Sequence, residues 1–102
     1  MGSRISKDAR GKTRLVTREF KILNQYGLHA RPAALFVKTA SRFECDVSIE
    51  KDGNKVSGKS IMGLMTLEAG LGVRLKVTAD GPDAEALLNE LQALIENKFY
   101  EE

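Results

Sequence analysis

The segment VRLKVTADGPDAEALLNELQALI, residues Val73 to Ile95, decides the fold class because two periodicities follow one another within it. Apolar and polar residues alternate from Val73 to Ala79, which predicts a half-buried β-strand. After the turn Gly81-Pro82-Asp83, apolar residues recur at helical spacing from Ala84 to Ile95, and they form the clearest amphipathic helix of the chain. Proline and an acidic residue suit a first helical turn, so we expect Pro82 and Asp83 at its N-terminal end.

The rest of the chain extends this pattern in the N-terminal direction. We predict a strand from Leu15 to Leu23, a helical face that begins at Ala33, and a short apolar helix from Ser60 to Met65. Two short alternating runs, 46–50 and 54–58, flank an Asp-Gly turn and predict a hairpin. Half-polar strands combined with amphipathic helices favour an α+β fold in which helices cover one face of an antiparallel sheet.

Charge divides the chain of 102 residues at residue 14. Residues 1–14 carry five basic residues and one acidic residue, whereas residues 15–102 carry eleven basic and thirteen acidic ones. We therefore expect a basic, disordered leader over 1–14 and one domain over 15–102. The basicity is confined to few residues, and no aromatic residues are interleaved with them, which argues against nucleic-acid binding.

Residue types and apolar run lengths exclude several classes of protein. No apolar run approaches the roughly 20 residues that a membrane-spanning helix needs, and no apolar h-region follows the basic N-terminus. Cys45 is the only cysteine and His29 the only histidine, so neither an internal disulfide nor a structural zinc site is expected. Cys45 is expected to be a small buried or edge residue. We expect a cytoplasmic protein without a metal or other cofactor.

The candidate functional residue is His29, within Gly27-Leu28-His29-Ala30-Arg31-Pro32. The imidazole lies where a glycine-containing loop enters a helix, and Pro32 fits the first helical turn. Neither Ala30 nor Arg31, the candidate N-cap positions, has a side chain that could cap the helix, so its N–H groups remain available to an anion. Arg31 adds a guanidinium suited to phosphate oxygens.

Imidazole is nucleophilic near neutral pH and can form a covalent intermediate. A phosphoryl group on the ring of His29 would lie at the positive end of the helix dipole. The site has no second histidine, carboxylate pair or metal cluster to complete a hydrolase or kinase. These residues therefore favour a phosphoryl carrier, which is not itself an enzyme, over a catalyst. Gly27 is expected to set the loop conformation that aims the ring.

The sequence resembles the HPr family, the histidine-containing phosphocarriers of the bacterial phosphoenolpyruvate-dependent phosphotransferase system. Gly27-Leu28-His29-Ala30-Arg31-Pro32-Ala33 is similar to the active-site signature of that family, and Lys59–Leu67 is similar to its regulatory-serine segment. The likeness extends from about Val16 to Phe99. It implies an open-faced sandwich with a four-stranded antiparallel sheet and three helices on one side.

The resemblance also implies roles and partners. His29 would accept a phosphoryl group on Nδ1 from phosphorylated Enzyme I and pass it to IIA proteins of the sugar or nitrogen branch, while Arg31 would pair with the phosphoryl oxygens. Ser60 would match the serine phosphorylated by HPr kinase/phosphorylase, although an ordinary helix N-cap is an equally weighted alternative. The protein would be a monomer.

Some positions leave the mechanism open. Ile61, Met62 and Met65 are too apolar for a solvated short helix, so some of them are expected to form an exposed docking patch. Lys38 is a candidate for a positive rim that extends the docking surface, with an ordinary surface lysine as the favoured alternative. Tyr26 departs from the smaller polar residue often found there in the family, and we expect it to pack beside the ring. The alternative function is a regulatory module that docks to a kinase or a transcriptional regulator through Ser60 and that patch.

Overall fold

The computed structural model describes residues 15–101, so the expectation about residues 1–14 lies outside the described part. The chain forms, in order, β1 (Leu15–Lys21), α1 (Ala30–Ala40), β2 (Asp46–Lys51), β3 (Asn54–Ser57), α2 (Ile61–Thr66), β4 (Arg74–Asp80), α3 (Ala84–Glu96) and the 3-10 turn η1 (Lys98–Tyr100). The strand–helix order therefore agrees with the sequence prediction. The turn η1 is an addition that the sequence pattern did not indicate.

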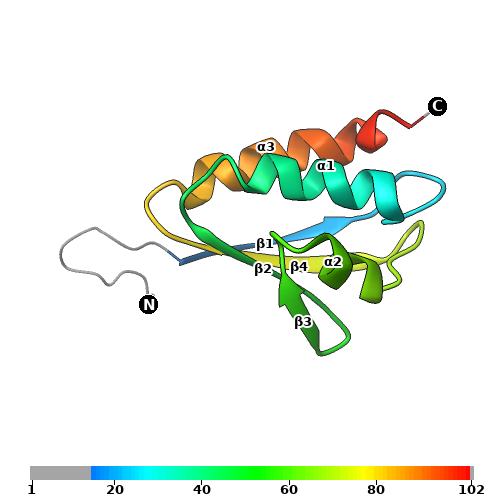
Figure 1. Ribbon diagram of the computed structural model, residues 1–102, viewed down its shortest axis with the longest axis horizontal. Helices are drawn as coiled ribbons and strands as arrows, with labels where there is room; N and C mark the ends of the chain where they lie inside the picture. The colour runs from blue at the N-terminus through cyan, green and yellow to red at the C-terminus, as the bar shows by residue number, and fades with distance from the viewer. Residues whose placement is uncertain (1–14, 102) are drawn as a thin grey trace.

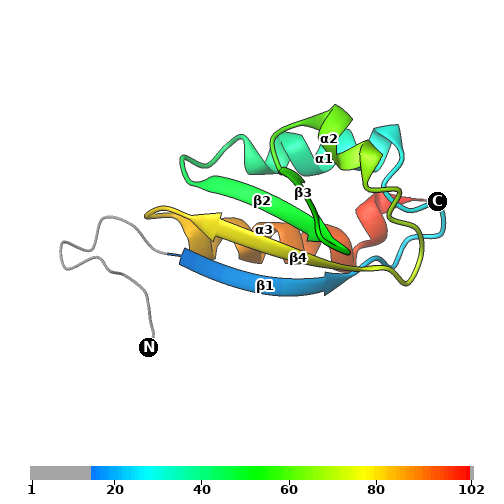
Figure 2. The same cartoon turned by 90° about the horizontal axis from the view of Figure 1, so that it is seen from below.

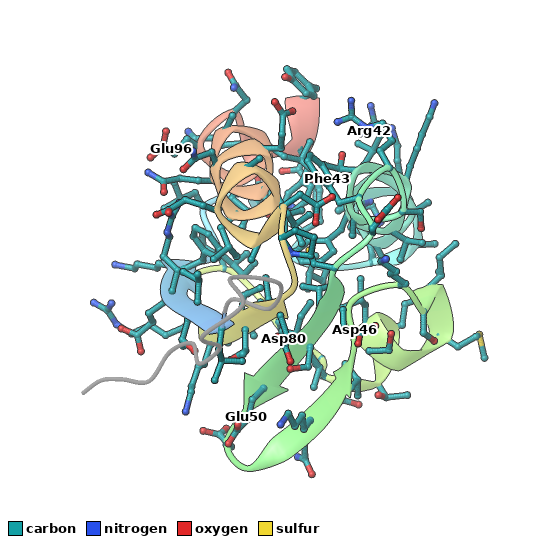
Figure 3. The ribbon with its side chains drawn as sticks, turned by 90° about the vertical axis from the view of Figure 1, so that its left-hand side faces the viewer. Arg42, Phe43, Asp46, Glu50, Asp80 and Glu96 are labelled. Atoms are coloured by element: carbon teal, nitrogen blue, oxygen red, sulfur yellow. The ribbon has the colours of Figure 1, made fainter. Side chains whose placement is uncertain are left out.

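The four strands form one antiparallel sheet in the order β1-β4-β2-β3. Figure 2 shows the strands in this order with the long helices α1 and α3 behind them. Figure 3 views the molecule along the axes of α1 and α3, which lie side by side over the sheet. Asp46 of β2 and Asp80 of β4, which are partners in the strand register, are labelled in the same view. The predicted α+β open-faced sandwich is confirmed.

The core lies between the sheet and the helices and is built from the predicted apolar faces. Its largest fully buried apolar side chains are Ile22, Phe36, Ile49, Leu64, Leu75, Val77, Leu87, Leu88, Leu91 and Phe99. One polar residue interrupts the inner face of β1. Arg18 donates hydrogen bonds through Nη1 to Asn89 Oδ1 and Gln92 Oε1 of α3, at 3.0 and 2.9 Å. The guanidinium thus spans from the edge strand to the helix that covers it.

One helix start differs from the sequence expectation, and a second agrees with it. Helix α1 begins at Ala30, and His29, not Ala30 or Arg31, is its N-cap. Asp83 lies just before α3, as its N-cap, and its carboxylate accepts from the backbone N–H groups of Glu44 and Cys45 at 2.9 and 3.0 Å. Asp83 therefore joins the start of α3 to the segment that enters β2.

The predicted hairpin is confirmed: Asp52 and Gly53 adopt φ angles of 51° and 85° between β2 and β3, as a two-residue hairpin turn requires. Three connecting segments that are far apart in the sequence lie together. The β1–α1 loop, the α2–β4 loop and η1 meet at one end of the sandwich (Figure 1). Among residues 15–101, no helix is long and apolar enough to cross a membrane.

Candidate functional site

The loop before α1 is fixed by backbone contacts to the α2–β4 loop. Gly27 has a φ of +69°, and a Cβ at this position would clash with the carbonyl oxygen of Ala69. The next residue, Leu28, is buried and donates its N–H to that same oxygen at 2.9 Å. Both the left-handed φ and the lack of room for a Cβ therefore require glycine at position 27. This turn sets the direction in which the chain enters His29.

His29 is the N-cap of α1, with an extended backbone (φ −80°, ψ −168°), and its carbonyl accepts from the Ala33 N–H at 3.0 Å. Its ring makes no capping hydrogen bond to the helix. Because its side chain is 47% exposed, the imidazole is accessible from solvent while its backbone is fixed. Pro32 is buried in the first turn, where its missing N–H removes no helical hydrogen bond.

The start of α1 is electropositive. No side chain caps this end of the helix, and the helix dipole places about half a positive charge there. Arg31 is exposed, and its Nη1 donates to the carbonyl oxygen of Phe99 at 3.4 Å. The structure thus places a cation within the same first turn that follows His29, and it connects that cation to the C-terminal turn.

Glu101, which follows η1, contributes a carboxylate that the sequence pattern did not indicate. Glu101 accepts hydrogen bonds from Asn24 Nδ2 (3.2 Å), the Gln25 N–H (2.7 Å) and the Tyr26 N–H (3.3 Å). Its Oε2 lies 3.8 Å from Nε2 of His29. Burial alone would raise the pKa of this carboxyl, but the loop donors and the nearby imidazole lower the pKa below its ordinary value of 4.5.

Tyr26 packs beside the imidazole, as expected. The two ring centroids are 6.2 Å apart and the planes meet at 83°, an edge-to-face arrangement. Tyr26 and His29 line a shallow pocket together with Leu28, Met65, Glu68, Ala69 and Gly70. The loop itself is held by Asn24, whose Nδ2 also donates to the Gly27 carbonyl at 2.8 Å.

Helix α2 stands beside this pocket and carries the other predicted residues. Ser60 is its N-cap, and Oγ accepts from the Gly63 N–H at 2.9 Å. Three apolar side chains of α2 are exposed, with exposed fractions of 40% for Ile61, 75% for Met62 and 40% for Met65. Met65 lines the pocket with His29, so the exposed patch borders the imidazole.

Lys38 is not brought to His29. It is exposed near the C-terminal end of α1, nine residues along the helix, which corresponds to about 13 Å of helical rise. There it lines a groove between α1 and α3 with Arg42, Glu90 and Tyr100.

Cys45 takes no part in this site. Burial, reinforced by the Asp83 carboxylate, raises the pKa of its thiol to about 11, so the sulfur stays protonated near neutral pH. Within residues 15–101, no group of three His, Cys, Asp or Glu side chains could hold a metal ion.

Comparison with known proteins gives one consistent family. Residues 16–97 match the model of the PTS HPr component phosphorylation site. The chain is similar to the Phosphocarrier protein HPr of Treponema pallidum (strain Nichols), with 44% identity over 88 residues, which cover 86% of this chain and 100% of that relative.

Solved structures agree with this match. A crystal structure of HPr-C-His from Thermoanaerobacter tengcongensis superposes with a TM-score of 0.82 at 49% identity, covering 85% of this chain and 98% of the other. A crystal structure of Bacillus subtilis Crh, described as a catabolite repression protein with a swapped domain in a dimer, gives a TM-score of 0.66 at 44% identity, covering 81% of this chain and 95% of the other.

Proposed function

The chain belongs to the HPr family of phosphocarrier proteins of the phosphotransferase system, and on that premise we propose that His29 is its phosphoryl acceptor. The phosphoryl group would come from phosphorylated Enzyme I and pass to IIA proteins in the cytoplasm. HPr is a carrier and not a catalyst in its own right, so the partners supply the remaining catalytic groups.

One observation carries this proposal: a half-exposed imidazole lies at the start of an eleven-residue helix that no side chain caps. Phosphorylation on Nδ1 would place the anionic oxygens near the helix N–H groups and near Arg31. A group held in this way is stabilised against spontaneous loss, yet its P–N bond remains accessible to the next acceptor because the ring faces solvent.

The exposed apolar patch of α2, formed by Ile61, Met62 and Met65, is the docking surface that this function needs. Methionine side chains adapt to differently shaped partners, which suits a carrier that binds a donor and several acceptors in turn. Lys38 lies too far along α1 to contact a phosphoryl group on His29. Its contribution would be limited to contacts at the edge of the surface that a partner covers. We expect the carrier to act as a monomer, although Crh was solved as a domain-swapped dimer.

Regulation through Ser60 forms the second part of the proposal. A phosphate on Ser60 would add about −1.5 to −2 charges beside the apolar patch and would repel an acidic partner. The similarity to Crh favours a second candidate function, a regulatory module that docks to a kinase or a transcriptional regulator. His29 favours the carrier, because a module that acts by docking alone has no need of an accessible imidazole.

The test is phosphorylation with phosphoenolpyruvate and Enzyme I, followed by intact mass. We expect one added phosphoryl group that is labile in acid and stable in base, and none in His29→Ala. Uptake by His29→Ala would show that the acceptor is another residue. With ATP and the kinase, an acid-stable phosphate that disappears in Ser60→Ala would support the regulatory part, whereas an unlabelled wild type would leave Ser60 as a helix cap.

A further inference from the structure

The C-terminal turn contacts both residues of the proposed acceptor site. Lys98, Phe99 and Tyr100 have φ angles of 54° to 55°, which turns the chain back toward the β1–α1 loop, and the Phe99 side chain is fully buried. The Phe99 carbonyl accepts from Arg31, and the Glu101 carboxylate lies opposite His29. A left-handed conformation is costly for residues other than glycine, so the packing of Phe99 and these contacts must hold the turn.

The Glu101 carboxylate is fixed in direction. Asn24 Nδ2 and the N–H groups of Gln25 and Tyr26 occupy its two oxygens, and its side chain is only 13% exposed. Oε2 faces Nε2 of His29 at 3.8 Å, an ion-pair distance when the ring is protonated. Because Glu101 stands on the Nε2 side of the ring, Nδ1 is the nitrogen that it leaves open.

We propose that Glu101 is a positioning residue for phosphoryl acceptance: its carboxylate keeps the ring proton on Nε2 of His29 and stabilises the positive charge that the ring gains when Nδ1 is phosphorylated. The inference rests on the proposed function. It gives Glu101 the part that a buried carboxylate plays toward histidine in hydrolytic triads, at a longer distance and in a more exposed site.

The step balances without a further reactant. The lone pair of Nδ1 forms the bond to phosphorus while the bond between phosphorus and the donor atom breaks, and its electron pair stays on the donor. Nε2 keeps its proton, so the ring becomes a cation, and Glu101 is the carboxylate that faces this charge. In the onward transfer or in hydrolysis the P–N bond breaks, and its electron pair returns to the ring, which is again neutral.

The other groups around the ring do not provide this negative charge at Nε2. Tyr26 contacts the imidazole through its aromatic ring, and Arg31 is a cation whose Nη1 donates to the Phe99 carbonyl. Glu68 lines the same pocket with an exposed side chain. Among the described residues, Glu101 is therefore the one whose carboxylate lies at ion-pair distance from His29.

The test is the pH profile of phosphoryl loss from the phosphorylated full-length protein, because the protonated ring is the better leaving group. Glu101→Gln keeps the size of the side chain and removes its charge. Glu96→Gln is the matched control, since Glu96 is exposed on α3 and accepts from Gln92. Glu101→Asp retains the charge on a shorter side chain.

Without the carboxylate the protonated ring is less stable, so we expect the pH profile of Glu101→Gln to move toward acid by about half a pH unit, the size expected for a partly exposed ion pair. On the alkaline side of the profile, phosphoryl loss should then be about threefold slower than in the wild type. Glu96→Gln should match the wild type, and Glu101→Asp should lie between. Equal profiles for Glu101→Gln and Glu96→Gln would overturn the inference while the carrier function stands. A wild type that takes no phosphoryl group on His29 would instead refute the proposed function itself.

Discussion

Replacing Gly27 by alanine adds one methyl group at the point where the acceptor loop crosses the α2–β4 loop. Two costs follow. The left-handed φ of +69° costs a non-glycine residue about 1–2 kcal/mol. The new Cβ also displaces the Ala69 carbonyl, which accepts from the Leu28 N–H, and a buried donor left without its partner costs about 1–3 kcal/mol. We therefore expect Gly27→Ala to lower the free energy of unfolding by about 2–5 kcal/mol.

Two other glycines separate these costs. A Cβ on Gly53 meets nothing within 4 Å, but its φ is +85°, so Gly53→Ala should show the conformational cost alone, about 1–2 kcal/mol. A Cβ on Gly70 also meets nothing within 4 Å, and Gly70 has no left-handed φ, so Gly70→Ala should change stability by less than about 0.5 kcal/mol. The assay is urea unfolding of the three variants. A loss in Gly27→Ala no larger than that in Gly53→Ala would refute the role of the Ala69 contact.

Three further predictions concern residues outside this loop. Ser60→Ala removes the oxygen that accepts from Gly63 and should lower the free energy of unfolding by about 1 kcal/mol in urea titrations; an unchanged midpoint would mean that the cap contributes nothing. Cys45 should react with iodoacetamide at pH 8 only at the rate at which the protein opens, whereas labelling at the speed of an exposed cysteine, followed by intact mass, would contradict its burial. Hydrogen bonds from the backbone of Glu44 and from Cys45 lower the pKa of Asp83 below 3.8, so its stabilisation is present above pH 3.8 and is lost as the pH falls through the folded-state value. The stability difference between wild type and Asp83→Asn should therefore shrink in acid, and a constant difference down to pH 2 would contradict this linkage.

Most of the fold could be predicted from periodicity. The segment Val73 to Ile95 contains a strand and a helix, and the structure places them as β4 and α3. Every leucine and isoleucine of this segment is buried, and the exposed apolar residues of α3 are the small alanines Ala86 and Ala93. The polar interruption at Arg18 could not be interpreted in advance. Its partners, Asn89 and Gln92, are distant in sequence and lie on the polar flank of a helix that looks complete without them.

The start of α1 was misplaced because the usual sign of a helix start is absent. Ala30 and Arg31 lack a capping side chain, and histidine is not among the residues that are preferred at an N-cap. The lack of a capping side chain nevertheless predicted an anion site, because the N–H groups of an uncapped helix start are available to an anion. His29, Arg31 and Gly27 could therefore be proposed as a site even with the helix boundary displaced.

Glu101 could not have been found from the pattern of residues. Its approach to His29 depends on three successive left-handed residues, and neither glycine nor asparagine is present at 98–100 to indicate such a turn. Buried Phe99 holds that turn, but a single apolar residue after an amphipathic helix is normally interpreted as one more helical position. Only the three-dimensional structure brings the carboxylate to the loop donors and the ring.

NMR of the phosphorylated protein with 15N-labelled histidine shows which nitrogen of His29, if either, carries the phosphoryl group. Because this chain has one histidine, its two ring nitrogens can be assigned without ambiguity. We expect a phosphorus-coupled Nδ1 and a protonated Nε2 facing Glu101. A phosphorus-coupled Nε2, or a phosphorylated protein whose histidine nitrogens show no coupling to phosphorus, would contradict this expectation.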